Sequence, residues 1–592
     1  MFSKWRWRWC RRRSRTTDKP GYSIRNGQNA KGELRGGVAV TLSRLRASIS
    51  DEILIFAAIL ISALPYIGAI GFYSDDWALL QAYDSLRSGG VGQLLGAGFE
   101  TPSIERPLYG IYLSALFALF GLNPLPHHLI NTGVLALSGV VLFKLLKDLK
   151  VPRDLAFATV ILFGFLPQLT TLRVWYATFQ IGLSLLLLLF SARLELRFAR
   201  QGGAWTKILA LACAAGSLAA YETTAPLLAV TALGAAWIRA RRSGQWVSAV
   251  AIALPNLLVI SGGLALKRLV TNRIKDPSSL ADQLATIFWT FWTPFYDWKT
   301  NDGLNLWAAL SVNFWHSFVA EAQSLMRVWD IQYGFAVVLL SVAIGIVAFV
   351  RLKDSTNPAP RSNYALAFLL AGFAVFWLGY AVFFLNRMVH FAPVSTGNRM
   401  ATPASIGVAM VLIGAAKLFA DRVGGSHRRQ LFGMIVATAV TVGSVHASAV
   451  ASRWARAWSI EATVLDRASI DLAALPDDAT VILDGVCPYD GPAIVFEAPW
   501  DWSSAVSIKL GKGIAGDVAI PSLQVTDAGL TTQIYDIKNT YAYGSRLYVY
   551  RPDVRRVIVL TDLQAAQAYW PHHQSAARKC PRGYPTMGVL SW

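Results

Sequence analysis

Residues 53–72 read Ile53-Leu-Ile-Phe-Ala-Ala-Ile-Leu-Ile-Ser-Ala-Leu-Pro-Tyr-Ile-Gly-Ala-Ile-Gly-Phe72, and Tyr73-Ser-Asp-Asp-Trp77 follows directly. The run carries no charge, and as a helix it is long enough to cross a bilayer core of roughly 30 Å. Ionised carboxylates close to a bilayer are costly, and those that occur commonly have a function. The stretch therefore predicts a membrane-spanning helix that leads into an acidic pair, Asp75 and Asp76, at one membrane face.

The composition of the 592-residue chain is typical of a polytopic membrane protein. Hydrophobic residues make up 54% of it and charged residues 15%, with a mean hydropathy of +0.41, which is more apolar surface than one soluble core can bury. The formal net charge is +20. Because the basic residues cluster between apolar segments, membrane topology accounts for this charge, and we expect membrane lipid and no nucleic acid as a partner.

Residues 1–52 form a basic tail. This tail contains Lys4-Trp-Arg-Trp-Arg-Trp-Cys-Arg-Arg-Arg13 and lacks the apolar core of a signal peptide. We therefore expect residues 53–72 to remain as an anchor and the amino terminus to lie in the cytoplasm. The alternation of Trp and Arg fits either a contact with anionic lipid or a solvated basic tail.

Ten further apolar windows follow the first, so that eleven spans are predicted. They are residues 128–146, 155–171, 177–193, 205–222, 224–239, 246–265, 332–350, 364–385, 401–419 and 431–449. With a cytoplasmic start, every loop on the cytoplasmic side is rich in Lys and Arg, which is the positive-inside pattern. Residues 108–120 would break this alternation if they crossed, so they are expected to lie half-embedded at the outer surface.

An odd number of spans places the carboxyl-terminal region outside the cytoplasm, and the composition changes there. After a helical pattern at residues 451–475, short strands are predicted at residues 480–484, 493–496, 545–550 and 557–560. The predicted fold class is therefore mainly α: a polytopic membrane helical bundle of about eleven transmembrane helices at residues 53–450, with an extracytoplasmic soluble α/β domain at residues 451–592.

Two of the four cysteines, Cys487 and Cys580, fall in this domain. The oxidising compartment and the even number favour a disulfide between them, and two free, buried cysteines are the alternative.

Three long segments are predicted at the outer surface: residues 73–127, 266–330 and 386–400. The second contains Phe288-Trp-Thr-Phe-Trp-Thr-Pro-Phe-Tyr-Asp-Trp298, an aromatic run that suits either a lipid headgroup boundary or stacking on sugar faces. Because the bulk of the loops and the acidic pair share one side, the sequence favours chemistry at that membrane face.

Several ordered motifs resemble those of the GT-C superfamily of integral-membrane glycosyltransferases. They are Phe72-Tyr-Ser-Asp-Asp-Trp77, Glu105-Arg-Pro-Leu108, Leu119-Phe-Gly-Leu-Asn-Pro124, His128-Leu-Ile-Asn131 and Tyr221-Glu-Thr-Thr-Ala-Pro226. In this the chain is similar to the dolichyl- or polyprenyl-phosphate mannosyltransferase-like and the arabinosyltransferase-like families. The resemblance implies inverting transfer of a sugar from a polyprenyl-phosphate donor to an envelope glycan or glycolipid, at the outer face of the bacterial cytoplasmic (inner) membrane.

For that reaction Asp75 or Asp76 is the expected general base, with a slight preference for Asp75. The other carboxylate could orient the acceptor, raise the pKa of the base or bind a divalent metal. The structural alternative is that the pair caps the helix that follows. No spacing typical of a metal site is present. The expected donor is a polyprenyl-phosphate-linked sugar, and a divalent metal is the one cofactor left open.

The leaving phosphate needs cations, and the outer segments offer several. The candidates are Arg399, which ranks first, Arg106, Arg387, Arg173 and His390. Each could instead contact a lipid headgroup. The candidates for contacts with the substrates are Glu105, His128, Asn131, Tyr176, Glu222 and Trp298. For Glu222, a bond to a neighbouring span is the alternative.

Two other classes of protein fit part of the pattern. A transporter or flippase of lipid-linked sugars also needs spans, outer arginines and aromatic boundaries, but it predicts charges deep within several spans. A non-catalytic scaffold that binds envelope glycans should tolerate loss of both aspartates.

Overall fold

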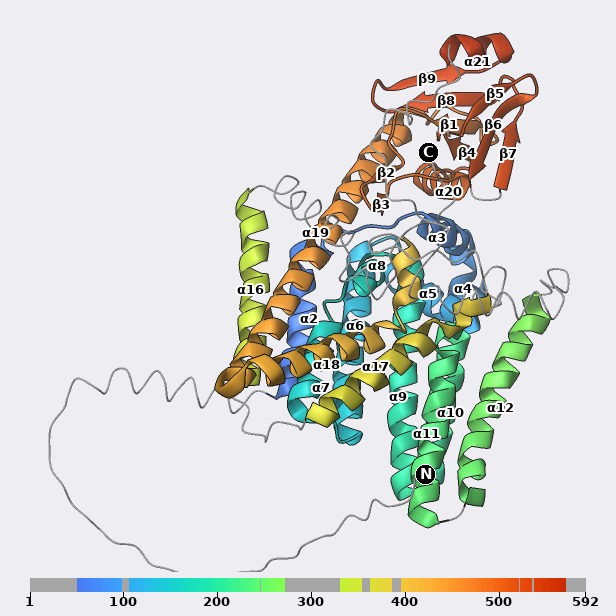
Figure 1. Cartoon of the computed structure of the whole chain (residues 1–592). Helices are drawn as coiled ribbons and strands as arrows, with labels where there is room; N and C mark the ends of the chain where they lie inside the picture. The colour runs from blue at the N-terminus through green and yellow to red at the C-terminus, as the bar shows by residue number, and fades with distance from the viewer. Residues whose placement is uncertain are drawn as a thin grey trace, which may run out of the picture. The chain divides into compact units, whose positions relative to one another are not determined.

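The computed structural model describes residues 50–97, 106–244, 246–271, 331–353, 362–385, 396–520, 522–534 and 537–570. Helices dominate up to residue 471, and strands begin at residue 480 (Figure 1). The predicted fold class, mainly helical with a sheet region at the carboxyl-terminal end, is thus confirmed in its outline.

Each of the eleven predicted windows contains a helix. These helices are α2 (Asp51–Ile67), α6 (Pro124–Asp148), α7 (Arg153–Phe163), α9 (Phe179–Gln201), α10 (Ala204–Ala220), α11 (Ala225–Ser243), α12 (Trp246–Thr271), α16 (Ile331–Lys353), α17 (Ser362–Tyr380), α18 (Ser405–Val423) and α19 (Arg428–Asp471). Within the described ranges, six helices are long and apolar enough to cross a membrane alone, and a bent pair would make a seventh. The chain is therefore a multi-pass membrane protein, while the number eleven stays a prediction.

The bent pair lies in the window at residues 155–171, which was predicted as one uninterrupted span. Helix α7 ends at Phe163, and a 3₁₀ turn (Pro167–Leu169) and the short α8 (Thr170–Val174) follow at an angle of 55°. Pro167 has no N–H to continue the ladder and restricts Leu166 to extended backbone (φ −68°, ψ 142°). As a result, residues 170–178 leave the direction of the helix and return toward the acidic pair.

Among the described residues between α2 and α6 are three shorter α-helices. They are α3 (Asp75–Leu86), α4 (Gly90–Ala97) and α5 (Pro107–Phe120). Helix α5 has 14 residues and is apolar, but it is too short to cross a bilayer.

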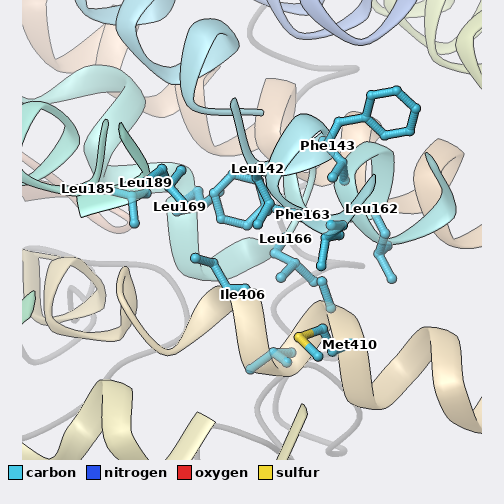
Figure 2. Packing of buried hydrophobic residues seen from close by; sticks show 14 of the residues in the cluster. Leu142, Phe143, Leu162, Phe163, Leu166, Leu169, Leu185, Leu189, Ile406 and Met410 are labelled. Carbon is cyan, nitrogen blue, oxygen red and sulfur yellow. The ribbon is translucent and has the colours of Figure 1, made fainter. Parts of the chain in front are cut away.

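The main apolar core of the helical part joins segments that are far apart in sequence. Figure 2 shows Ile406 and Met410 of α18 near Leu162 and Leu166, at the end of α7, in the same cluster as Leu185 and Leu189 of α9. Most of these side chains are nearly inaccessible to solvent. This packing holds the break after α7 in a defined position although the backbone there is irregular.

Helix α19 passes without interruption through the predicted domain boundary at residue 451. Its 44 residues correspond to about 66 Å at about 1.5 Å per residue, which is roughly twice the thickness of a bilayer core. One rigid element therefore connects the membrane part to the strands (Figure 1).

The carboxyl-terminal region contains a four-stranded sheet in the order β4-β1-β8-β9. Strand β1 (Thr480–Leu483) is parallel to β4 (Ala515–Val518) and β8 (Leu547–Arg551), and β9 (Arg556–Val559) is antiparallel to β8. The remaining elements are β2 (Tyr489–Asp490), β3 (Ala493–Ile494), α20 (Pro499–Leu510), β5 (Gln524–Thr526), β6 (Gly529–Ile534), β7 (Ile537–Tyr541) and α21 (Leu563–Tyr569). All four predicted strands are present, as β1, β3, β8 and β9.

The cysteines of this region bear on the predicted disulfide. Cys487 is disulfide-bonded, whereas Cys213, in α10, is free. Because Cys580 lies outside the described residues, the pairing of Cys487 with Cys580 stays a prediction.

Candidate functional site

The acidic pair begins helix α3, directly after a sharp backbone turn. The backbone of Ser74 has φ 48° and ψ −118°, and the N–H of Asp76 donates to the carbonyl of Tyr73 at 3.0 Å. These values match the second residue of a type II′ turn, a position that favours glycine because φ is positive. A serine there is strained by about 1–3 kcal/mol and persists only when its surroundings hold it.

Asp76 is completely buried and is held by backbone on two sides. Its two oxygens accept hydrogen bonds from the N–H groups of Tyr73, at 2.8 Å, and Ala177, at 2.7 Å. Burial raises the pKa of Asp76 well above its ordinary value, and these N–H groups act in the opposite direction. Asp76 thereby joins the acidic turn to residues 170–178, a role that goes beyond capping of α3.

Asp75 has a different environment from its neighbour. Its side chain is half-buried, and burial raises the pKa of its carboxyl group, while the guanidinium of Arg399 and the indole of Trp500 act in the opposite direction. Of the two carboxylates it is therefore the one that can meet a substrate. The structure thus gives the two aspartates separate environments: backbone N–H groups hold Asp76, whereas Asp75 is only half-buried.

Arg399 lies in a 3₁₀ turn (Thr396–Ala401) and is half-buried. Its guanidinium carbon lies 4.6 Å from the centroid of the Trp175 ring, and the Trp175 indole N–H in turn donates to the carbonyl of Tyr73 at 3.1 Å. In the part of the chain that the structure describes, no carboxylate forms an ion pair with Arg399. A cation held over an aromatic ring, and close enough to Asp75 to lower its pKa, is thus available to an anion.

The other two arginine candidates that the structure describes, Arg106 and Arg173, already have partners within the protein. Arg106 forms a two-point ion pair with Glu222, with N···O distances of 2.9 and 2.8 Å, and Lys267 lies 2.6 Å from the same carboxylate. Although burial acts in the opposite direction, these cations lower the pKa of Glu222 to about 2. Glu222 thus holds Arg106 and Lys267 together, and the contact of Arg106 with a donor phosphate stays a prediction.

Arg173 is buried and donates to Ser62 at 3.1 Å, to Tyr66 at 3.2 Å and to the carbonyl of Gly164. These bonds connect α8 to α2 and satisfy a carbonyl at the end of α7. Its contact with a donor phosphate stays a prediction, since these bonds already engage the guanidinium with two hydroxyls and a backbone carbonyl.

Three predicted substrate contacts lie inside the protein. The side chains of His128, Asn131 and Tyr176 are bonded to the carbonyls of Gly71 (2.9 Å), Leu172 (2.6 Å) and Leu113 (2.7 Å), respectively. All three are buried. The bonds of His128 and Asn131 reach backbone next to the acidic turn and after the break that follows α7, and that of Tyr176 reaches a carbonyl within α5. Their contact with a substrate stays a prediction.

Four further candidates, Glu105, Trp298, Arg387 and His390, lie outside the described residues. Among the described residues, no group of three His, Cys, Asp or Glu side chains is placed to hold a metal ion. An open apolar groove of about 320 Å³ lies between α2 and α16. It is lined by Ile61, Leu64, Pro65, Ala336, Val337 and Leu340.

Two carboxylates that the sequence did not single out also reach the acidic turn. Glu461 of α19 accepts from the indole N–H of Trp77 at 2.9 Å, and Glu497 accepts from the hydroxyl of Ser74 at 3.1 Å. Both are buried. They lie more than 380 positions from their partners in sequence, and no local pattern marks either one.

Comparisons with known proteins place the chain in no family. No protein-family model and no curated protein matches it. Among solved structures it is similar to ArnT from Cupriavidus metallidurans bound to undecaprenyl phosphate, with 13% identity and a TM-score of 0.34, and to the apo state of ArnT, with 12% identity and a TM-score of 0.33. Each alignment covers 82% of this chain and 86% of the other. At these values the likeness carries no argument about the site.

Replacement of Asp76 with asparagine is expected to destabilise the protein by about 1–3 kcal/mol, because one amide oxygen replaces two acceptors and its NH₂ group then faces a backbone N–H. The measurement is the midpoint of thermal unfolding of the purified protein in detergent. Asp84→Asn, on the same helix, is the control and should leave the midpoint unchanged. An equal midpoint for Asp76→Asn and the parent would refute the supporting role of Asp76.

Proposed function

We propose that this protein is a membrane glycosyltransferase that moves a sugar from a polyprenyl-phosphate donor to a glycan or glycolipid acceptor. The observation that carries the proposal is the half-buried carboxylate of Asp75, the first residue of α3, whose pKa is lowered by the guanidinium of Arg399 that lies over the Trp175 ring. A base and an anion-binding group in one partly desolvated place are what this transfer requires.

The reaction follows from these two groups. Asp75 takes the proton of an acceptor hydroxyl as its oxygen attacks the anomeric carbon, and the bond from that carbon to the phosphate oxygen breaks. The electron pair of this bond goes to the phosphate, and Arg399 stabilises the added negative charge, with Arg106 as a second cationic candidate. Attack from the face opposite the phosphate inverts the configuration at the anomeric carbon.

The isoprenoid part of the donor needs an apolar surface that is open to the bilayer. The groove between α2 and α16 provides one, and its α2 residues lie within the last seven residues of the helix that leads to the acidic turn. The loops rich in Lys and Arg support a cytoplasmic amino terminus, with the site at the outer face of the bacterial inner membrane.

The decisive experiment is a transfer assay with a panel of polyprenyl-phosphate sugars and glycan or glycolipid acceptors. We expect at least one donor to be consumed, with an inverted glycosidic bond in the product. Movement of an intact lipid-linked sugar across a vesicle membrane, without a new glycosidic bond, would replace this proposal with a flippase. Binding of an envelope glycan with neither activity would indicate a scaffold.

The pH profile of transfer is expected to show an acid limb above the range of an ordinary aspartate. Burial raises the pKa of Asp75, and a general base acts only when it is deprotonated, so activity should rise with pH through that raised pKa. The measurement is kcat/KM for the donor from acidic to neutral pH. An acid limb at or below the ordinary pKa of aspartate would contradict the assignment.

A further inference from the structure

The carboxyl-terminal region packs directly on the helix that carries the acidic pair. Helix α20 lies against α3 (Figure 1), and the hydrogen bond between Ser74 and Glu497 crosses this contact. Trp500, in the first turn of α20, acts to lower the pKa of the Asp75 carboxyl group. The region therefore meets the candidate site itself, and not only the neighbouring helices.

Glu497 is buried and is held in position by neighbouring residues of the carboxyl-terminal region. Only 2% of it is exposed, and besides Ser74 its carboxylate accepts from the hydroxyl of Tyr489. Its backbone N–H donates to Asp501, at 2.8 Å, in the bond pattern that begins α20. The backbone and the carboxylate of Glu497 are thus both held by bonds other than the one to Ser74.

Ser74 is the residue at which such a bond matters most. It immediately precedes Asp75 and has a backbone conformation that costs a non-glycine residue free energy. Glycine would occupy this turn without strain, but it could not reach Glu497. Serine is strained in this turn, but its hydroxyl forms a hydrogen bond to Glu497 that glycine could not form.

We infer that Glu497 is a positioning residue for sugar transfer: it holds the hydroxyl of Ser74, fixes the turn, and so directs the Asp75 carboxylate into the site. The carboxyl-terminal region then contributes a positioning residue to the catalytic centre. The inference rests on the proposed function, because it assigns Glu497 a role in that same reaction.

A through-space effect of the Glu497 charge is the competing explanation, and one substitution separates the two. Glu497→Gln removes the charge but keeps an oxygen that accepts from Ser74, whereas Glu497→Ala removes both. If positioning is the role, Glu497→Gln should retain most of the parental kcat and Glu497→Ala should not.

The test measures kcat and the donor KM of the full-length protein in detergent. For Glu497→Ala and Ser74→Ala we expect a loss in kcat of about tenfold with little change in KM, because the base is misdirected while donor binding persists. The double variant should lose no more than either single variant, since both remove one interaction. The acid limb of the pH profile should keep its position.

Two further variants separate positioning from stability. Asp562→Ala removes a carboxylate that caps α21 in the same region, through Ala565 at 2.8 Å, without contact to Ser74, and should leave kcat unchanged. Ser74→Gly relieves the strain, so it should fold well and yet lose turnover as Ser74→Ala does.

Two results would overturn the inference. One is a parental kcat in Glu497→Ala and Ser74→Ala, and the other is a loss in Glu497→Gln equal to that in Glu497→Ala. If the parent protein forms no new glycosidic bond with any donor, the proposed function itself fails, and if Asp75→Asn transfers sugar normally, the general-base assignment fails. If Asp75→Asn is inactive and Glu497→Ala is normal, only the positioning role fails.

Discussion

Replacement of Asp75 with asparagine is expected to lower the kcat of sugar transfer by about 10²–10⁴-fold, the contribution of one well-placed general base. Asparagine keeps the size of the side chain and can accept hydrogen bonds, but it cannot take a proton from the acceptor hydroxyl. Because Asp75 is half-buried and its oxygens have none of the backbone bonds that hold Asp76, the fold should be unaffected. The measurement is kcat at saturating donor and acceptor, on protein with a parental unfolding midpoint.

Asp84→Asn is the matched control for this prediction. It makes the same change in α3, about two and a half turns after Asp75, and should retain the parental kcat. A parental kcat in Asp75→Asn would refute the general-base assignment. A large loss in Asp76→Asn together with a parental kcat in Asp75→Asn would exchange the roles of the two residues.

The helices of the membrane part could be predicted from the sequence because each rests on a local property. An apolar run of sufficient length lowers its free energy in lipid only as a helix, whatever surrounds it. Residues 53–72 and the windows after them satisfy this condition, and each contains a helix. The position of the acidic pair at the end of α2 followed from the same argument.

The break within residues 155–171 could not be seen from hydropathy, since the residues on both sides of it are apolar. Pro167 was a local signal for it, although proline also occurs inside continuous membrane helices, as Pro255 does in α12. Packing against α18 and the bonds of Arg173 and Asn131 hold this segment as a broken helix, and none of these contacts can be read from hydropathy.

Buried polar residues next to irregular backbone were the hardest to interpret. His128, Asn131 and Tyr176 were predicted as contacts for substrates, and the first two belong to a motif that resembles the GT-C superfamily. In the structure each satisfies a backbone carbonyl. An interrupted helix needs such partners, and the sequence does not indicate which carbonyl will need one.

The distinction between Asp75 and Asp76 depends on contacts that are distant in sequence. Two adjacent carboxylates are equivalent until residue 177 approaches one of them and Arg399 the other. Glu497 is separated from Ser74 by 423 positions, so only the folded chain shows that it belongs to the site.

Replacement of Arg399 with glutamine is expected to lower kcat/KM for the donor by about 10²–10³-fold, the usual effect of removing one group that stabilises developing charge. It should also move the acid limb of the pH profile to higher pH. Arg399 lowers the pKa of Asp75, so without this cation the carboxylate is protonated more easily and the base becomes active only at higher pH. The measurement is the full pH profile of kcat/KM for the parent and the variant.

Lysine at position 399 separates the two effects of the arginine. The charge remains, so the acid limb should stay near its parental position, but the planar fork that stacks on Trp175 and binds two phosphate oxygens is lost, so kcat/KM should still fall. Arg422→Gln, in the last turn of α18, is the control for removal of a positive charge and should change neither quantity. If Arg399→Gln lowers kcat/KM but leaves the acid limb in place, Arg399 binds the donor without acting on Asp75. If the limb moves and kcat/KM at its optimum does not fall, Arg399 adjusts the pKa of the base but does not bind the phosphate, and Arg106 becomes the candidate for that role.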